Sequence, residues 1–298
     1  MLSSSDYGAL RAFAAVAEES SFSRAAQTLG VSPSALSQMV RGLEDRVGAR
    51  LLNRTTRSVS LTETGRMLLD RIRPAMGDLG AAVQDVRSTN GRPAGTVRVH
   101  AFRVAAELFL APMLAQFTRD YPEIVLDVTL DDKVSDIVAG GFDVAIRLGE
   151  TIERDMVAIR LGPDLRQVAV ASPAYLAEHG TPSTPDDLLH HRCIRWRWPG
   201  RGAPYAWEFH EKGRWFTVAV DGPLIADSRG FGIAAAATGA GIAFAIEEAV
   251  APYVRDGRLV PLLEAWSAPF PGFFLCYPQQ RHMSPALRAF VDRLKSTS

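Results

Sequence analysis

A polar face recurs at helical spacing near the N-terminus, and its side chains could contact nucleic acid. It consists of Ser34, Ser37, Gln38, Arg41 and Asp45. Hydroxyl and amide groups can hydrogen-bond the edges of bases, and a glutamine can pair with adenine through two bonds. Arg41 comes one turn later and suits a phosphate group. The alternative is a polar helix face that contacts only water.

A second group of polar and basic residues lies between two short apolar stretches. Arg54, Thr55 and Arg57 fall between Leu51-Leu52-Asn53 and Val59-Ser60-Leu61, which are both typical of strands. The sequence therefore predicts a hairpin whose tip carries arginine and threonine, residues suited to phosphate contacts beside a groove. Each arginine–phosphate contact releases counterions and should add about 0.9 unit to the salt dependence of binding.

Charge is uneven along the chain although the total is balanced. Lys+Arg and Asp+Glu each number 33, so the formal net charge is zero. Residues 1–92 hold twelve Arg and nine acidic residues, which gives a net charge of +3, and six of these Arg lie between positions 50 and 73. Such a local excess fits nucleic-acid binding, but it also fits a solvated surface.

Short helices are predicted to position these side chains. An apolar stripe indicates the first helix, and it consists of Leu10, Phe13, Val16 and Ala17. Residues 21–30 form the second helix, which begins at a serine cap and ends at Gly30. The third begins at Ser32-Pro33, with proline at the first helical position. Its expected core positions are Leu36, Val40, Leu43 and Val47. Together with the hairpin, these helices predict a winged helix-turn-helix.

The order of these residues resembles the N-terminal domain of LysR-type transcriptional regulators. The matching run is Phe22-Ser-Arg-Ala-Ala, Leu29-Gly-Val-Ser-Pro-Ser-Ala-Leu-Ser-Gln, Leu43-Glu-Asp, Gly48-Ala-Arg-Leu-Leu-Asn-Arg-Thr-Thr-Arg and Leu61-Thr-Glu-Thr-Gly65. The resemblance implies DNA contacts from the recognition helix through Ser34, Ser37, Gln38 and Arg41. It implies contacts from the wing through Arg54 and Arg57, with Thr55 beside them.

A long helix is predicted over Thr62–Thr89. Its apolar stripe consists of Leu68, Leu69, Ile72, Met76, Leu79, Val83 and Val86. Two copies of this stripe could bury each other, or the stripe could pack on its own chain. Pro74 should kink the helix or remove one hydrogen bond. In the resembled family this segment is a linker helix that pairs two subunits, so that two DNA-binding domains face a pseudo-palindromic DNA site.

The remaining residues alternate between strands and helices after a linker at 91–95 that is rich in Gly and Pro. The first predicted set has strands at Thr96–His100, Ile124–Leu130 and Phe142–Leu148, with helices at Val104–Asp120 and Val134–Ala139. A second set begins at Arg166–Ala171. Alternation at this spacing predicts a parallel α/β arrangement.

This half of the chain is similar to the effector domain of the same family, which has the fold of type 2 periplasmic binding proteins. Matching stretches include Gly141-Phe-Asp-Val-Ala-Ile-Arg-Leu-Gly149 and Ser284-Pro-Ala-Leu-Arg-Ala-Phe. The resemblance implies an α/β multidomain chain with a winged helix-turn-helix domain at 1–61, a linker helix at 62–92 and an effector-binding domain at 93–298. Two lobes, 93–162 with 268–298 and 163–267, would flank a pocket.

Position in the expected fold selects candidates for the effector pocket, which are His100, Phe102, Arg103, Arg147, Trp196, Trp198 and Ser228. The first three lie where the first strand meets its helix, whose N–H groups can hold an anion. Arg147 ends a strand at the edge where ligands bind in open α/β sheets. An aromatic, basic pocket suggests a small carboxylate or an aromatic anion. A place in the core or a surface ion pair is the alternative role of each residue.

Composition and motifs argue against several other classes of protein. Hydrophobic residues make up 47% and charged residues 22%, as in ordinary globular proteins. The N-terminus lacks the pattern of a signal peptide, and Cys193 and Cys276 are too few for a disulfide framework, so we expect a cytoplasmic protein. The longest uncharged run, 231–246, is too short to cross a bilayer. A solute-binding protein for transport would need an export signal and would not use residues 1–60.

The sequence also lacks several well-known catalytic motifs of enzymes. Gly-x-Ser-x-Gly, His-Glu-x-x-His and Walker motifs do not occur. His190, His191 and Cys193 have no spaced fourth ligand, so neither a metal nor a cofactor is expected. Inert buried thiols are expected at Cys193 and Cys276, with a redox switch as the alternative. The sequence thus predicts a bacterial transcriptional regulator of LysR type, a homotetramer that binds double-stranded DNA and responds to a small effector.

Overall fold

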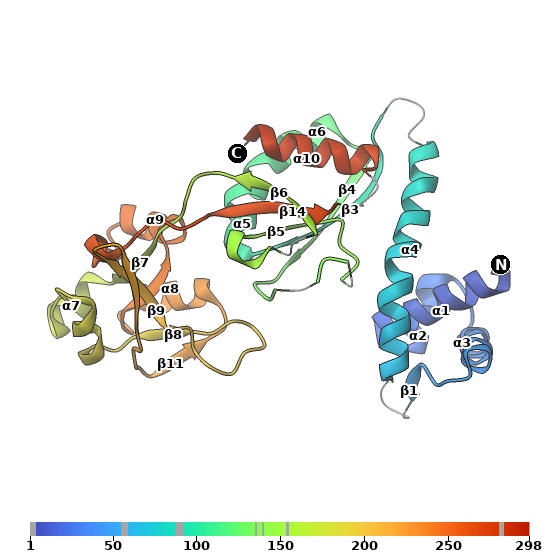
Figure 1. The fold of residues 1–298 in the computed structure, drawn as a ribbon, viewed down its shortest axis with the longest axis horizontal. Helices are drawn as coiled ribbons and strands as arrows, with labels where there is room; N and C mark the ends of the chain where they lie inside the picture. The colour runs from blue at the N-terminus through green and yellow to red at the C-terminus, as the bar shows by residue number, and fades with distance from the viewer. Residues whose placement is uncertain are drawn as a thin grey trace.

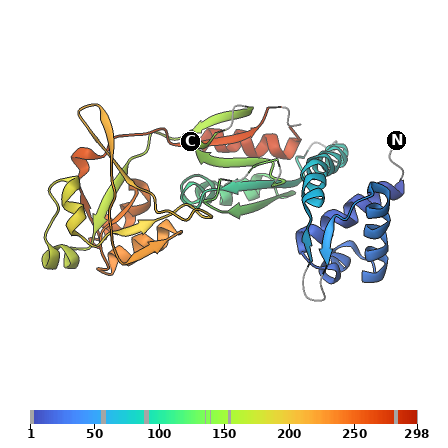
Figure 2. The same ribbon diagram turned by 60° about the horizontal axis from the view of Figure 1, so that its bottom comes forward.

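The computed structural model describes residues 4–54, 59–87, 92–134, 136–138, 140–152, 155–279 and 283–297. The N-terminal helices, one long helix and two sheet-containing lobes follow one another along the longest axis (Figure 1). Figure 2 gives the same order from another direction, with the long helix between the N-terminal domain and the nearer lobe. Among the described helices, none has the length and apolar character that a membrane span requires.

The N-terminal domain consists of α1 (Ser4–Glu19), α2 (Phe22–Leu29) and α3 (Pro33–Val47) around a shared apolar core. The predicted caps are confirmed, because the side chains of Ser21 and Ser32 each accept a backbone N–H of their helix. Gly30 and Gly48 end α2 and α3 at φ of 67° and 72°. The prediction that Val47 is a core residue is wrong. It is 46% exposed, because it is the last residue of α3 and lies at the rim of the domain.

The predicted wing is present as β1 (Leu52–Arg54) and β2 (Val59–Leu61), which pair antiparallel with Leu52 opposite Leu61. The long helix α4 (Glu63–Arg87) begins directly after it. A Cβ on Gly65 would lie 2.0 Å from the carbonyl oxygen of Leu51, so the first turn of α4 touches the wing backbone. The helix continues past residue 74, and the proline there does not end it.

The apolar stripe of α4 divides into two parts. Leu68, Leu69, Ile72 and Met76 pack against the core of the N-terminal domain. In this part the stripe packs on its own chain, which was the alternative to pairing with a second subunit. Leu79, one turn further, is 53% exposed. The side chains of Val83 and Val86 lie outside the described part of the helix. Leu79 is therefore the described stripe residue that is open to a partner.

The lobe nearer α4, which we call lobe I, is built on a five-stranded sheet of order β4-β3-β5-β14-β6. Its strands are β3 (Gly95–Ala101), β4 (Ile124–Leu130), β5 (Val144–Leu148), β6 (Met156–Leu161) and β14 (Phe273–Pro278). β3 is parallel to β4 and β5, whereas β14 is antiparallel to both of its neighbours. The sheet is mixed, which corrects the prediction of a parallel sheet. β14 returns from the other lobe, so no strand–helix–strand crossover sets its direction.

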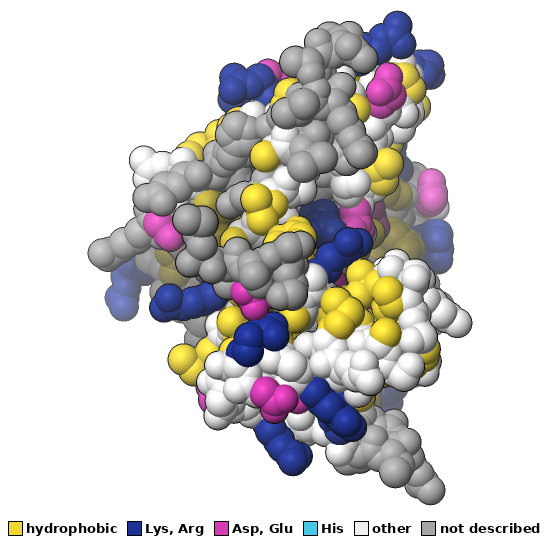
Figure 3. Space-filling view, turned by 90° about the vertical axis from the view of Figure 1, so that its right-hand side faces the viewer, with side chains coloured by type: hydrophobic (Ala, Val, Ile, Leu, Met, Phe, Trp, Pro, Cys, Tyr) yellow, Lys and Arg dark blue, Asp and Glu magenta, His cyan; other side chains and the backbone are white. Residues whose placement is uncertain are grey.

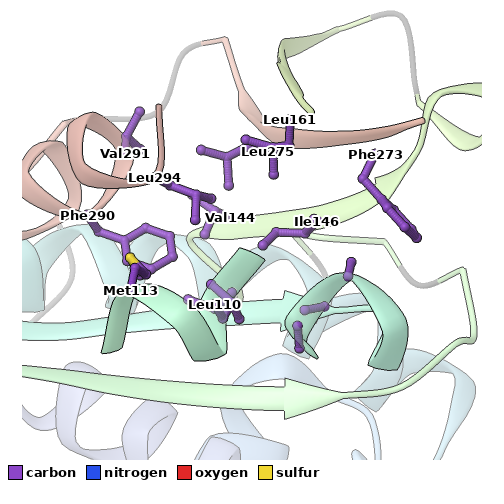
Figure 4. Close-up of a cluster of buried hydrophobic side chains, with 14 of the residues drawn as sticks. Leu110, Met113, Val144, Ile146, Leu161, Phe273, Leu275, Phe290, Val291 and Leu294 are labelled. Carbon is purple, nitrogen blue, oxygen red and sulfur yellow. The ribbon is translucent and has the colours of Figure 1, made fainter. Parts of the chain in front are cut away.

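Helices cover one face of this sheet. A helical segment formed by α5 (Arg103–Ala105), a π turn (Ala106–Leu110) and α6 (Ala111–Asp120) packs beside α10 (Pro285–Thr297). Figure 4 shows the core between these helices and the strands, with Phe290 and Leu294 of α10 facing Val144 and Ile146 of β5. Side chains alternate along a strand, so neighbouring positions such as Ala145 point to the opposite face.

That opposite face is covered by loops and not by the predicted helix. None of the described residues between 134 and 139 is helical, and 137 and 138 form a turn, so the helix predicted at Val134–Ala139 is wrong. Six residues followed directly by Gly140 and Gly141 are too few to propagate a helix. Ile137 nevertheless packs beneath the sheet with Ala145 and Cys276.

The second lobe contains small sheets. β7 (Gln167–Ala171) pairs antiparallel with β12 (Ala243–Ile246) and β13 (Val260–Leu262), and β8 (Ile194–Trp196) pairs parallel with β11 (Leu224–Ala226). A hairpin joins β9 (Trp207–Glu211) to β10 (Arg214–Val218). The helices are α7 (Pro173–His179), α8 (Arg229–Ala237) and α9 (Glu247–Arg255). The chain enters and leaves this lobe side by side, with Leu165 and Phe270 joined by backbone hydrogen bonds.

Candidate functional site

α3 presents the predicted polar face to solvent. Ser34, Gln38 and Arg41 are exposed and Ser37 is half-buried, whereas the apolar side of the helix fills the domain core. Figure 3 views the molecule from the side of the N-terminal domain, and Lys and Arg side chains lie over that surface with acidic side chains between them. Ser34, Gln38 and Arg41 are therefore accessible to a ligand, and the apolar side of the helix is packed in the domain core.

A hollow of about 640 Å³ lies between α3 and the wing. It is lined by Arg41, Glu44, Asp45, Gly48, Ala49, Arg50, Leu52 and Arg54. Three arginines thus face two acidic residues, and Arg41 and Arg50 are exposed. A concave, net positive surface beside a polar helix suits the phosphate groups of a nucleic-acid backbone.

Arg54 is held inside this arrangement by its own protein. Its Nη1 donates to Oγ of Ser37 at 3.1 Å, and its Nη2 donates to Oε2 of Glu44 at 3.1 Å. The guanidinium carbon also lies 4.6 Å from the ring centroid of Phe22. The other wing candidates, Thr55 and Arg57, lie outside the described residues.

Aromatic side chains close the cleft between the two lobes around a cavity of about 20 Å³. Its lining residues are Phe102, Val104, Asp132, Leu148, Gln167, Trp196, Trp198, Arg229, Ile246, Phe270 and Phe273. The ring centroid of Trp198 lies 4.6 Å from that of Trp196 and 5.9 Å from that of Phe102, so it bridges the lobes. Three predicted pocket residues, Phe102, Trp196 and Trp198, therefore come together here.

Comparisons with known proteins match both halves of the chain. Residues 7–66 match the bacterial regulatory helix-turn-helix protein, lysR family, and residues 90–298 match the LysR substrate binding domain. The chain is 42% identical to the HTH-type transcriptional regulator YcaN of Escherichia coli, over 95% of this chain and 93% of the relative. A putative transcriptional regulator of Pseudomonas aeruginosa is 43% identical, over 97% and 94%. CrgA, a LysR-type transcriptional regulator from Neisseria meningitidis, superimposes with a TM-score of 0.61 at 30% identity, over 97% of each chain.

The chain belongs to the LysR family of transcriptional regulators. It is a DNA-binding regulator with an effector-binding domain, and its relatives are regulators and not enzymes. Members of the LysR family bind DNA, respond to small-molecule effectors and oligomerise. The sequence-based resemblance and the predicted combination of a winged helix-turn-helix with a two-lobed α/β domain are confirmed.

Arg229 belongs to the cleft of this LysR-type regulator, although sequence reasoning missed it. Its Cζ lies 3.7 Å from the ring centroid of Trp196, and its Nη1 donates to Oε1 of Gln167 at 3.5 Å. Burial lowers the pKa of its guanidinium to about 10. The available signal was its place in the first turn of α8, directly after Ser228, which was selected for the same reason.

The other predicted effector residues do not line the cleft cavity. Ser228 caps α8 by accepting the N–H of Phe231 at 3.3 Å, and it borders a smaller adjacent hollow. The Arg103 side chain is 47% exposed and pairs with Asp132 at 3.4 Å. His100 and Arg147 are buried on the face of the lobe I sheet that lies opposite α6 and α10. The reason for Arg147 is strand alternation, because Leu148 and not Arg147 faces the cavity.

His100 is a polar side chain in an apolar place. It is 1% exposed, and neither ring nitrogen has a hydrogen-bond partner among the described residues. Burial, and next the positive charge of Arg147, hold the pKa of His100 below its ordinary value. The imidazole is therefore neutral at physiological pH.

Possible metal ligands and the two cysteines are the remaining candidates for chemistry. Within the part of the chain that the structure describes, no group of three or more His, Cys, Asp or Glu side chains is arranged to hold a metal ion. Cys193 and Cys276 are both buried, and burial raises the pKa of the Cys193 thiol to about 12. A protonated, buried thiol is a weak nucleophile.

Proposed function

We propose that α3 lies in the major groove of an operator, with Ser34, Ser37 and Gln38 at base edges and Arg41 on a phosphate group. The support is the division of α3 itself, whose apolar side forms the domain core while its polar side is exposed. The wing residues Arg54, Thr55 and Arg57 would lie along the neighbouring sugar–phosphate backbone.

The experiment that tests this proposal separates base contacts from phosphate contacts. Duplexes enriched from a random library by the purified protein are titrated over a range of salt concentrations. Gln38→Ala should relax the base preference without changing the salt slope, whereas Arg41→Ala should flatten the slope by about 0.9 unit per subunit. Failure of the wild-type protein to enrich any sequence would refute the proposed reading of DNA by α3.

We propose that the effector is a small carboxylate or an aromatic anion bound between the lobes. Arg229 supplies the cation at the cleft, and Trp196, Trp198 and Phe102 supply aromatic surface. A cavity of about 20 Å³ has room for about one water molecule, so an effector has to displace Trp198 or separate the lobes. Binding would then favour a more open arrangement of the lobes. This change in lobe arrangement would transmit effector binding to the DNA-binding domain.

Thermal unfolding with a panel of aromatic carboxylates tests the effector proposal. A carboxylate that binds should raise the melting temperature of the wild-type protein. Arg229→Met should abolish that rise. The matched control is Arg258→Met, since Arg258 also lies over an aromatic ring, that of Tyr253, at 4.8 Å. If Arg229→Met and Arg258→Met respond to the carboxylate like the wild type, Arg229 does not bind the effector.

We further propose that two subunits pair through residues 62–89 and that pairs assemble into a homotetramer on a pseudo-palindromic operator. The exposed Leu79 on α4 supports the pairing. Two paired DNA-binding domains match a DNA site with two-fold symmetry. The regulator would act in the cytoplasm, where the DNA is, with the effector as its one small ligand and no cofactor.

A further inference from the structure

We infer that Glu44 and Arg54 are positioning residues that hold the hydroxyl of Ser37 as a hydrogen-bond donor toward DNA. The inference deepens the proposed reading of DNA by α3 and rests on it. It changes the role expected for Arg54, from a phosphate contact to a residue that acts through Ser37.

Glu44 ties the recognition helix to the wing. Its Oε1 accepts the backbone N–H groups of Leu51 and Leu52, at 2.9 and 3.2 Å. Its Oε2 accepts from Nη2 of Arg54 at 3.1 Å, and the Glu44 side chain is only 13% exposed. Both carboxylate oxygens are therefore used to fix β1 and the guanidinium of Arg54 relative to α3. Charge-assisted bonds of this kind are among the stronger ones in proteins.

Arg54 passes this orientation on to Ser37. Its guanidinium is held on three sides, by Glu44, by the ring of Phe22 and by Oγ of Ser37. A guanidinium can only donate hydrogen bonds, so Oγ of Ser37 must act as the acceptor in this pair. Among the described residues, no acceptor takes the hydroxyl proton of Ser37. That proton is left to point away from Arg54, toward the exposed side of α3.

A hydroxyl fixed in this way discriminates between base edges. In the major groove, guanine N7 and O6, adenine N7 and thymine O4 are acceptors, whereas the amino groups of cytosine and adenine are donors. A donor opposite Ser37 would leave its hydroxyl proton without a partner, which is unfavourable when water is excluded. Ser37 should therefore prefer an acceptor at one position of each half-site, by roughly threefold to tenfold in affinity, the value of one neutral hydrogen bond.

The same geometry predicts how Arg54 contributes to the salt dependence of binding. Its charge is already paired with Glu44 and its side chain is 26% exposed. An arginine whose charge is neutralised by an ion pair within the protein displaces few counterions from DNA. Arg41, by contrast, is exposed and has no ion pair among the described residues. The two arginines should therefore respond differently to the same substitution.

The test uses the full-length protein and duplexes enriched from a random library, with every single-base change tested in the best duplex. Arg54→Met and Arg54→Lys should both relax the preference at one position per half-site and leave the salt slope unchanged. Ser37→Ala should relax the same position, and Ser37→Ala combined with Arg54→Met should lose no more than either change alone. Arg41→Met is the matched control, and it should flatten the slope by about 0.9 unit per subunit.

Glu44→Gln distinguishes positioning from simple folding support. The substitution removes the charge that holds Arg54, so the freed guanidinium can reach a phosphate group. The salt slope should become steeper, by up to about 0.9 unit per subunit, while the base preference relaxes. A wing that merely unfolds would lower affinity for all duplexes and would not steepen the slope.

The outcomes separate the inference from the proposed function. If the wild-type protein enriches a sequence but Arg54→Met flattens the salt slope and keeps the base preference, Arg54 is a phosphate contact and the inference is wrong. Rescue by Arg54→Lys would lead to the same conclusion, because lysine restores the charge but not the two-sided geometry. If the wild-type protein enriches no sequence, the proposed reading of DNA fails and the inference fails with it.

Discussion

Two titratable side chains, the half-buried Arg229 and the buried His100, differ in what surrounds them. Arg229 lies over the ring of Trp196 and donates to Gln167, so its charge has partners in the cleft. His100 lies beneath the lobe I sheet with no hydrogen-bond partner among the described residues, so the fold favours its neutral form. His100 was identified from its position at a strand end. The face to which it points depends on strand alternation and packing, which its residue type alone does not reveal.

The lowered pKa of His100 predicts a loss of stability in acid. In the unfolded chain the imidazole takes up a proton near its ordinary pKa of 6.5, whereas the folded chain takes it up only at lower pH. Stability should therefore fall as the pH drops below 6.5, by at most about 1.4 kcal/mol per pH unit from this group. Urea unfolding at pH 8 and pH 5.5 measures the effect.

His100→Gln is the variant that isolates this contribution. His191 also has a pKa lowered by burial and adds to the acid sensitivity of the wild type. The difference between the wild type and His100→Gln removes that background, because His191 is present in both. The variant should lose less stability between pH 8 and pH 5.5. Equal losses in the two proteins would contradict the assignment of a neutral, buried His100.

At the scale of elements, the sequence reveals helix caps, which depend on nearby residues. It does not reveal the pairing of strands that are distant in the chain. The serine caps at 21 and 32 and the glycines at 30 and 48 fix α2 and α3 through contacts within a few residues. The direction of β14 depends on its pairing with β5 and β6, more than one hundred residues earlier in the chain. The apolar spacing of the segment 134–139 suggests a helix, although its short length and the glycines at 140 and 141 do not favour one. Local capping can therefore be read from sequence, but sheet topology requires the family resemblance.

The contact between α4 and the wing predicts opposite effects for two glycines in the same helix. Gly65→Ala should destabilise the N-terminal domain by about 1–3 kcal/mol, since the new Cβ meets the Leu51 carbonyl oxygen and the wing must move. Gly77→Ala should stabilise the helix by up to about 1 kcal/mol, because no neighbouring atom lies within 4 Å of the added group. Thermal unfolding compares them, and destabilisation of equal size in both variants would disprove the close approach.

At the scale of the whole molecule, α4 connects sensing to DNA binding. Leu69 and Ile72 in its first half pack against the core of the N-terminal domain. Arg73 of the same helix lies against Gly141 of lobe I. A hollow of about 450 Å³ lies between α1, α4 and lobe I. The sequence predicted the length and stripe of this helix. It did not reveal which part of the stripe is used within the chain, because that depends on how the N-terminal domain folds back on α4.

The exposed part of the stripe predicts how the regulator dimerises. Leu79→Glu should weaken the dimer, because two charged side chains would replace an apolar contact in the paired helices. Sedimentation at low protein concentration measures the loss, and affinity for a two-half-site duplex should fall with it, since a monomer contacts one half-site. Met67→Glu is the control, as Met67 is 64% exposed on the opposite side of α4 from the stripe. A dimer that survives Leu79→Glu but dissociates with Met67→Glu would place the interface on the other face of the helix.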